Sequence, residues 1–299
     1  MTIWVRLFLM SLAAWPTWVQ ADVNVFACEP EWGALTQELG GDKVKLFTAT
    51  SALQDPHRIQ ARPSLIAKMR QADLVVCTGA ELEIGWLPVL LRESGNNRVQ
   101  PGGPGYFEAA RTVNLLERPS RLDRAGGDIH PAGNPHIQGD PRNLLPVADG
   151  LAQALGQIDA SNAGYYQGRL MDFKRRWQGA LQKWSQRAAR LRGVAVVMQH
   201  RDPYLPAWLG VHAVAELEPL PGVEPSAAHL ATVLARLKQT PAKMILRPAY
   251  FSPRPSEWLA ERAGIPVVEL PFSVGGSPAA KDLFGLYDDT LDRMLEASK

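Results

Sequence analysis

The stretch from Ala160 to Leu191 reads ASNAGYYQGRLMDFKRRWQGALQKWSQRAARL, and the rest of the chain is organised around it. Its apolar residues recur three or four positions apart, as one face of a helix requires: Tyr166, Leu170, Phe173, Trp177, Leu181, Trp184, Ala188 and Leu191. Asp159 and Ser161 can cap the start of this helix, and Gly193 follows its end. At 1.5 Å per residue the helix would extend about 45 Å, which is the width of a whole domain.

Alternating strand and helix patterns precede this stretch, and a second alternating series follows it. We therefore predict an α/β protein: two lobes with mostly parallel sheets joined by one long connecting helix. The predicted boundaries are an N-terminal lobe over 22–158, the connecting helix over 159–192 and a C-terminal lobe over 193–299. The alternative is a long surface helix within one larger domain, and Gly164, Gly168 and Gly179 weaken the helix without excluding it.

In the first half, hydrophobic patterns predict strands at 23–28, 43–48 and 72–77, and helices at 32–39, 63–70, 81–92 and 143–158. Residues 98–100 and 112–116 are short strand candidates, and 117–140 is a long loop without hydrophobic period. In the second half, strands are predicted at 194–199, 212–218, 243–246 and 266–270, and helices at 203–209, 226–238, 255–263 and 279–295. Ligands of parallel sheets gather at the carboxyl ends of the strands, so we expect the functional residues there.

The composition is that of an ordinary globular protein. Of 299 residues, 46% are hydrophobic and 21% are charged, which excludes disordered and fibrous classes. The formal net charge is +2, and it falls to +1 if Arg6 is removed with the leader described next. This near-neutral balance gives no reason to propose nucleic acid as a partner, and the basic residues of the long helix are interpreted as its solvated face.

The first 21 residues resemble a secretory signal peptide. Arg6 supplies the positive start, 7–19 form an apolar segment, and Val19-Gln20-Ala21 is a small-x-small cleavage site. The apolar segment contains Pro16 and is too short to span a bilayer. No cysteine lies at the cleavage site, so we expect a cleaved signal peptide, no lipid anchor and export to the periplasm.

Two cysteines, Cys28 and Cys77, each lie near the carboxyl end of a predicted strand. If those strands are neighbours, an oxidising compartment permits a disulfide between them. The alternative is that both are small buried apolar side chains, and the sequence leaves the two possibilities level. Their wide spacing excludes a CxxC zinc site.

Three histidines occupy positions where such a fold exposes ligands. His57 lies in the loop after the second strand, His136 ends the long irregular loop, and His200 directly follows the strand 194–199. Two come from the first lobe and one from the second, so a cleft between the lobes can bring them together. Imidazole nitrogen is a usual ligand of Zn²⁺, and three imidazoles with a carboxylate or a water complete four-coordination.

The chain resembles the cluster A-I solute-binding proteins, the zinc and manganese receptors of bacterial ABC importers. The similarity covers nearly the whole mature chain in order, including the single long helix. It is carried by Asp55-Pro56-His57 with Pro63-Ser64, Ala72-Asp73-Leu74-Val75-Val76 with Gly79 and Leu82-Glu83, Asn134-Pro135-His136 with Asp140-Pro141, His200 with Tyr204 and Leu209-Gly210, and Glu224-Pro225-Ser226.

This resemblance implies a binding protein and not an enzyme. It implies that His57, His136 and His200 are metal ligands, that a membrane permease is the partner, and that the protein is a monomer. Histidine at the third position is typical of zinc-type members, and nitrogen ligands suit Zn²⁺ better than Mn²⁺. Zn²⁺ is therefore the expected transported ligand, ahead of Mn²⁺ and Fe²⁺, with affinity falling below about pH 6 as the imidazoles take up protons.

The chain departs from the family pattern in three places. The aspartate expected after the last strand is missing, and Glu269, Asp282 or a water is left as the fourth ligand. Arg247-Pro248 replaces the usual Glu-Pro, and the loop 117–127 has no histidine. His130 is expected to be a solvated loop residue, with a role as an auxiliary or entry ligand as the alternative.

A second hypothesis is an exported zinc hydrolase, because three histidines and a metal-bound water also form a catalytic zinc site. The chain contains neither a Gly-x-Ser-x-Gly elbow nor a His-Glu-x-x-His helix in support. A third, a receptor for haem or an iron chelate, requires that the three histidines do not converge.

Overall fold

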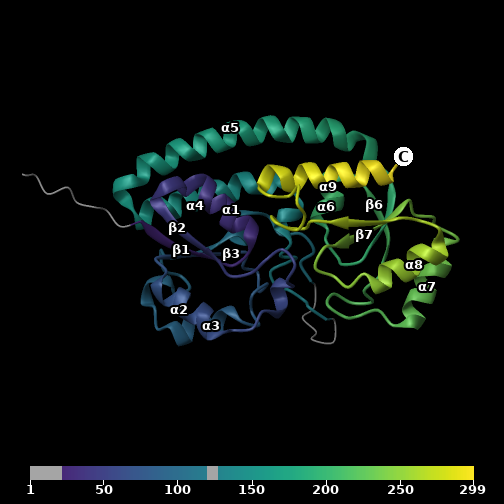
Figure 1. Cartoon of the computed structure of the whole chain (residues 1–299), viewed down its shortest axis with the longest axis horizontal. Coiled ribbons are helices and arrows are strands. Elements are labelled where there is room, and N and C mark those ends of the chain that lie inside the picture. Colours follow the sequence, from purple (N-terminus) through teal and green to yellow (C-terminus); the bar gives the residue numbers. More distant parts are fainter. Residues whose placement is uncertain (1–21, 120–126) are drawn as a thin grey trace, which may run out of the picture.

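The computed structural model describes residues 22–119 and 127–299, and the predicted signal segment 1–21 lies outside this part of the chain. Within it, two four-stranded parallel sheets form the centres of two lobes (Figure 1). The first sheet has the order β2-β1-β3-β4 and consists of β1 (Val23–Ala27), β2 (Val44–Thr48), β3 (Leu74–Cys77) and β4 (Tyr106–Glu108). The second has the order β6-β5-β7-β8 and consists of β5 (Ala195–Met198), β6 (His212–Glu216), β7 (Met244–Pro248) and β8 (Val267–Leu270).

The α-helices of the first half are α1 (Pro30–Gly40), α2 (Pro63–Gln71), α3 (Leu87–Ser94) and α4 (Leu144–Ile158). Those of the second half are α6 (Tyr204–Leu209), α7 (Ala227–Leu237), α8 (Arg254–Ala263) and α9 (Leu283–Ala297). The long helix α5 (Ala163–Ala188) runs across the top of both lobes, with α9 beneath it (Figure 1). The predicted architecture of two parallel α/β lobes joined by one long helix is confirmed.

The helix α5 has the extent that its apolar period predicts. Short 3-10 turns, Ala160–Asn162 and Ala189–Leu191, extend it at both ends. The Asp159 carboxylate holds the first turn, accepting hydrogen bonds from the side chains of Ser161, Asn162 and Tyr166. A carboxylate at this end also suits the positive pole of the helix.

A cluster of aromatic side chains fixes α5 against the rest of the molecule. Its members are Phe173, Trp177 and Trp184 of α5, Trp208 of α6, and Phe284 and Tyr287 of α9. Their ring centroids lie 4.9–6.4 Å apart, and such pairs contribute about 0.5–1.5 kcal/mol each beyond the burial of their surface. One continuous apolar core includes residues of α1, α4, α5 and α9 together with strands of both sheets. The two lobes are therefore packed into one body.

Three predicted elements of the first lobe are corrected by the structure. The helix predicted over 81–92 begins only at Leu87, because Gly79, Ala80 and Glu81 adopt left-handed backbone conformations that a helix cannot contain. Residues 98–100 and 112–116 are not strands: the first falls on a 3-10 turn (Asn97–Val99) that Asn96 caps, and the second follows another 3-10 turn (Ala109–Thr112). The fourth strand is instead β4, a three-residue edge strand too short to show a period.

Cys28 and Cys77 form a disulfide, which decides between the two possibilities that the sequence leaves level. Because β1 and β3 are adjacent parallel strands, their carboxyl ends lie together, with 4.8 Å between the two Cα atoms. The disulfide thus links the carboxyl ends of the two central strands of the first sheet.

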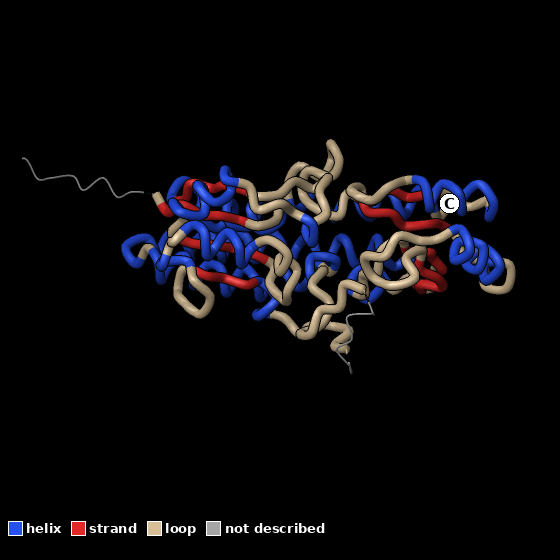
Figure 2. The backbone as a smooth tube through the Cα atoms, turned by 90° about the horizontal axis from the view of Figure 1, so that it is seen from below, coloured by secondary structure: helices blue, strands red, loops and turns tan. Residues whose placement is uncertain are grey.

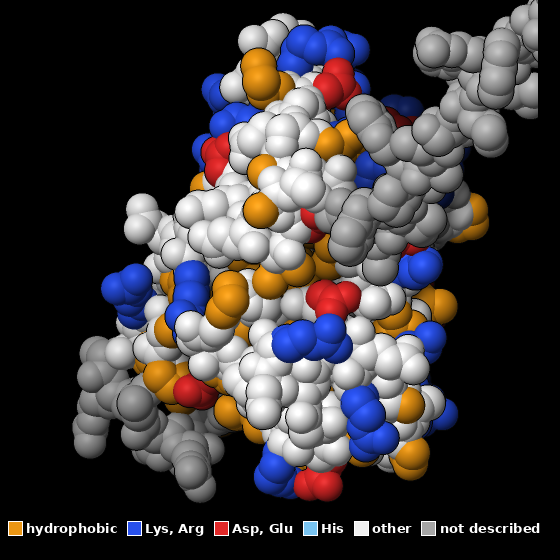
Figure 3. Space-filling view, turned by 90° about the vertical axis from the view of Figure 1, so that its left-hand side faces the viewer, with side chains coloured by type: hydrophobic (Ala, Val, Ile, Leu, Met, Phe, Trp, Pro, Cys, Tyr) orange, Lys and Arg blue, Asp and Glu red, His pale blue; other side chains and the backbone are white. Residues whose placement is uncertain are grey.

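The loops after the strands gather between the two lobes (Figure 2). The surface at the end of the N-terminal lobe carries Lys and Arg side chains interspersed with Asp and Glu, without a single-sign patch in that view (Figure 3). Within 22–119 and 127–299, no helix has both the length and the apolarity needed to cross a bilayer.

Candidate metal centre

His57 is held in a 3-10 turn, Pro56–Arg58, that begins after Asp55. The Asp55 carboxylate accepts a hydrogen bond from the backbone N–H of His57 (3.0 Å) and lies 2.9 Å from Nδ1 of the same residue. Burial raises the pKa of Asp55, but the hydrogen bonds that it accepts from His57 outweigh burial and lower that pKa below its usual value. Since a carboxylate only accepts, Nδ1 carries the proton and Nε2 keeps its lone pair free for a metal.

His200 follows β5 and is 5% exposed. Its Nδ1 lies 2.8 Å from Oε2 of Glu218, a buried carboxylate that also accepts the backbone N–H of Gly222 (3.2 Å). Here too a carboxylate fixes the ring and turns Nε2 toward the centre of the cleft.

His136 is the most deeply buried of the three, at 1% exposure, and its backbone N–H donates to Asn134 Oδ1 (3.0 Å). Its Nε2 lies 2.8 Å from Nε2 of His200, and its Nδ1 has no hydrogen-bond partner. A contact this short needs a proton between the two nitrogens. Because Glu218 fixes the proton of a neutral His200 on Nδ1, His136 donates from Nε2. Burial, followed by the charges of His200, His57 and His130, lowers the pKa of His136 well below its usual value.

The three rings converge, although they come from distant parts of the chain. Ring centroids of His57 lie 5.4 Å from His136 and 6.1 Å from His200, and His136 lies 4.8 Å from His200. All three line one pocket of about 470 Å³ between the lobes. Among the described residues, no choice of one nitrogen from each ring puts all three within 4.8 Å of one another. Zn–N bonds of about 2.0–2.1 Å at tetrahedral angles hold two ligand nitrogens about 3.3 Å apart. Binding an ion therefore requires the nitrogens of His136 and His200, now 2.8 Å apart, to separate slightly and the ring of His57 to approach them.

The residues left open as the fourth ligand lie elsewhere. Glu269 pairs with Arg247 at 2.5 Å, Asp282 accepts the backbone N–H of Gly285 at the start of α9, and neither lines the pocket that contains the three histidines. His130, expected to be solvated, is instead half-buried, and its ring centroid lies 5.4 Å from that of His57. Burial lowers the pKa of His130 to about 4.

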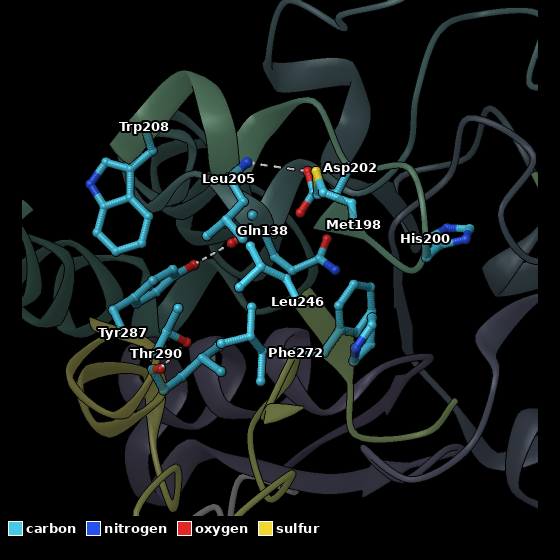
Figure 4. A pocket seen from close by; sticks show the side chains of 14 residues that line it. Gln138, Met198, His200, Asp202, Leu205, Trp208, Leu246, Phe272, Tyr287 and Thr290 are labelled. Atoms are coloured by element: carbon cyan, nitrogen blue, oxygen red, sulfur yellow. Dashed lines mark hydrogen bonds between the residues drawn. The ribbon is translucent and has the colours of Figure 1, made fainter. Parts of the chain in front are cut away.

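A second, apolar cavity of about 50 Å³ lies next to the centre, between the second sheet, α6 and α9. Figure 4 shows His200 at one side of it and Trp208 and Tyr287 at the other. Phe272, whose ring lies 5.5 Å from that of His136, closes it on the side of the histidines. The cavity is far smaller than the sites that hold organic ligands.

A family model described as ZnuA, the periplasmic zinc-uptake complex component A, matches residues 25–297. The chain belongs to the ZnuA family. It is 25% identical over 240 residues to the manganese ABC transporter substrate-binding lipoprotein PsaA of Streptococcus pneumoniae, covering 78% of this chain and 74% of PsaA. It is 23% identical to the metal ABC transporter substrate-binding lipoprotein FimA of Streptococcus parasanguinis, with the same two coverages.

Solved structures show the same fold. A crystal structure of ZnuA superposes with a TM-score of 0.77 at 21% identity, covering 93% of this chain and all of ZnuA. The Mn-bound periplasmic metal-binding protein of Candidatus Liberibacter asiaticus gives a TM-score of 0.74 at 18% identity, again over 93% of this chain and all of that one.

Membership of the ZnuA family settles the class of function. The protein is an extracytoplasmic metal-binding receptor of an ABC importer, with a membrane permease as its partner, and it is not an enzyme. The hydrolase alternative is therefore not favoured. The haem-receptor alternative required histidines that do not converge, and the three rings share one pocket.

Glu218 is the residue of the centre that sequence reasoning missed. It lies two residues beyond β6, at the carboxyl end where ligands of parallel strands gather. The hydrophobic pattern predicts a strand over 212–218 and so places Glu218 inside it, whereas β6 ends at Glu216 and leaves Glu218 in the loop that follows.

Proposed function

We propose that the protein captures Zn²⁺ in the cleft between its lobes, with His57, His136 and His200 as ligands, and delivers it to the permease. One observation carries this proposal: three imidazoles from separate segments of both lobes line one pocket, and carboxylates orient two of them. Because these two rings are oriented before the ion arrives, less free energy is lost in ordering them when it binds.

The chemistry of the donors supports zinc over manganese. Imidazole nitrogens suit Zn²⁺, whereas Mn²⁺ prefers carboxylate, carbonyl and water oxygens. Before His136 can bind the ion, the proton of its neutral ring moves from Nε2 to Nδ1, which leaves Nε2 free. Only unprotonated imidazole nitrogens bind the ion, so zinc affinity falls at low pH, where the rings take up protons. The protein acts as a periplasmic monomer after cleavage of residues 1–21, with lobes 22–158 and 193–299 joined by 159–192.

Calorimetric titration of metal-free protein with Zn²⁺, Mn²⁺ and Fe²⁺ tests the proposal. We expect one zinc ion per chain, bound more tightly than the other two metals. His57→Ala, His136→Ala and His200→Ala are each expected to weaken zinc binding by more than about 100-fold, since loss of a residue that merely orients a ligand already costs 10–100-fold.

The matched control is His212→Ala, which removes an exposed histidine at the start of β6. It should bind zinc as the parent does. If all three ligand variants bind zinc as tightly as the parent, the assignment of the site is wrong, and if Mn²⁺ binds more tightly than Zn²⁺, the choice of metal is wrong.

A further inference from the structure

A fourth imidazole, that of His130, lines the same pocket as the three proposed ligands. It belongs to the segment Gly127–Gly133, which crosses between the lobes. At one end of this segment the N–H of Asp128 donates to the carbonyl of Pro221 (2.9 Å), and directly after the other end the N–H of Asn134 donates to the carbonyl of Leu116 (2.8 Å). The backbone that bears His130 is therefore anchored on both sides.

The ring of His130 is held by a backbone carbonyl of the N-terminal lobe. Its Nδ1 lies 3.0 Å from the backbone carbonyl oxygen of Ala80. A carbonyl oxygen only accepts, so Nδ1 carries the proton and Nε2 keeps a free lone pair. This is the arrangement by which carboxylates prepare His57 and His200, with a carbonyl as the acceptor.

The carbonyl of Ala80 is aimed by a strained turn. Ala80 and Glu81 have φ values of 50° and 66°, in the left-handed region that residues other than glycine seldom occupy. The buried carboxylate of Glu83 accepts the N–H groups of Thr78 and Gly79 and so holds this turn in place. Strain of this kind persists where the surroundings enforce it, and it concentrates at functional sites.

Four of the six separations among the four rings are close to those of a tetrahedral zinc site, and His130 would have to move toward His136 and His200 to share their ion. Zn–N bonds of 2.0–2.1 Å at tetrahedral angles place the centroids of neighbouring imidazoles about 5 Å apart. The observed separations are 4.8 Å for His136–His200, 5.4 Å for both His57–His136 and His57–His130, and 6.1 Å for His57–His200. Within the described residues His130 makes a ring contact with His57 and none with His136 or His200, so it approaches from the side of His57.

We propose that His130 is the fourth zinc ligand, which replaces the missing aspartate and completes a site of four imidazoles. This inference rests on the proposed function, because it assigns a further ligand to the same ion. The position after β8, where the aspartate is expected, holds Pro271 and Phe272, and the ring of Phe272 packs against His136.

Two acidic residues, Glu117 and Asp128, also line the pocket. Glu117 pairs with Arg201 through both of its carboxylate oxygens, at 3.0 Å each. Asp128 lies against Gly222 of the C-terminal lobe, so closely that a Cβ at Gly222 would come within 1.9 Å of its Oδ2.

A fourth nitrogen ligand has a consequence for selectivity. With no oxygen ligand from the protein, the centre strongly disfavours Mn²⁺ relative to Zn²⁺. His130 would then be the residue that separates this chain from receptors with an oxygen ligand at the fourth position.

The test combines calorimetry with X-ray absorption spectroscopy of the zinc-loaded protein, in which bound imidazoles can be counted. The variants are His130→Ala and His130→Asp, with His212→Ala as the matched control, and circular dichroism of the metal-free proteins monitors folding. We expect four imidazoles in the parent and in His212→Ala, and three in His130→Ala with zinc affinity lowered at least about tenfold. His130→Asp is expected to recover zinc binding and to narrow the preference for Zn²⁺ over Mn²⁺.

The outcomes separate the two proposals. Three imidazoles in the parent, with unchanged affinity in His130→Ala, would overturn the role of His130 and leave the three-histidine receptor standing. A parent that binds no zinc would overturn both proposals together.

Discussion

At the scale of single residues, the centre depends on the groups that hold the imidazoles as much as on the imidazoles themselves. Asp55, Glu218 and the carbonyl of Ala80 each accept a hydrogen bond from a ring Nδ1–H, so that the opposite nitrogen, Nε2, carries no proton. Metal-binding histidines usually have such partners, which fix the tautomer and raise the basicity of the ring.

Glu218→Gln is therefore expected to weaken zinc binding by about 10–100-fold without abolishing it. The amide oxygen can still accept from His200 Nδ1, but the negative charge that favours the bound cation is lost. Calorimetric titration measures the change. The control is Glu216→Gln. It alters a half-buried glutamate two positions earlier in the chain, which pairs with Arg201 (3.8 Å). Equal losses in both variants would contradict a specific role for Glu218.

The sequence predicts the three histidines as candidates because each is tied to a local signal: a proline before it or a strand directly ahead of it. The partners of the rings leave no such trace. Glu218 is 18 residues from His200, and Ala80 is 50 residues from His130. Only the fold brings them together, which explains why His130 is expected to be solvated from sequence and is half-buried in the structure.

At the scale of elements, long amphipathic stretches are the most predictable. The apolar period of α5 gives both its extent and its buried face, since Tyr166, Leu170, Phe173, Trp177 and Trp184 are all buried. The helix predicted over 226–238 is also confirmed as α7, and the side chain of Ser226 caps it by accepting the N–H of His229. The edge strand β4 has only three half-buried residues, so tertiary pairing with β3 defines it and periodicity does not.

The glycines that weaken the prediction of α5 offer a test of its energetics. Gly168 and Gly179 are exposed in the helix interior, and a Cβ added at either meets no atom within 4 Å. Gly168→Ala and Gly179→Ala are each expected to raise the free energy of unfolding by about 1 kcal/mol. Urea unfolding of the metal-free protein measures this gain. Gly222→Ala, at φ 75° and in contact with Asp128, should instead destabilise, and a gain there would contradict the packing between the lobes.

At the scale of the whole molecule, the two lobes are held together at many points and have little freedom to part. The core is continuous, Arg58 donates to the carbonyl of Gly222 (2.7 Å), and Tyr287 donates to that of Gln138 (2.7 Å). The buried carboxyl of Glu31 in α1 accepts a hydrogen bond from the Ser273 hydroxyl, which also joins the two lobes.

This last contact predicts a pH dependence of stability. Burial, only partly offset by the Ser273 hydrogen bond, raises the pKa of Glu31 from 4.5 to about 7. The folded protein therefore holds a proton that the unfolded chain releases, and the contribution of Glu31 to stability falls as pH rises from about 4.5 to 7. Glu31→Gln mimics the protonated form, so its stability relative to the parent should rise by up to about 3 kcal/mol between pH 5 and pH 8.

Denaturant unfolding of the parent and Glu31→Gln at several pH values measures this difference. Glu257→Gln, at an exposed position of α8, is the control and should shift stability equally at every pH. A difference for Glu31→Gln that does not change with pH would rule out a raised pKa at this position.

The disulfide is expected to contribute substantially to the stability of the whole chain. Cys28 and Cys77 are 49 residues apart, and closing a loop of that length in the unfolded chain corresponds to about 4 kcal/mol. The double variant Cys28→Ala/Cys77→Ala should have a free energy of unfolding lower than that of the oxidised parent by that amount. The same decrease is expected for the parent under reductant, and urea unfolding measures both. Midpoints within the experimental error of the oxidised parent would show that the loop-closure account does not apply.

The same pair of cysteines also bears on how the receptor obtains the right cargo. Their sulfur atoms and a carboxylate oxygen of Glu83 lie within 4.8 Å of one another, all buried. In a reduced chain these would be two thiols beside a carboxylate, a donor set for which zinc has high affinity. Oxidation to the disulfide before the chain meets metal thus removes a second possible zinc site at the carboxyl ends of β1 and β3.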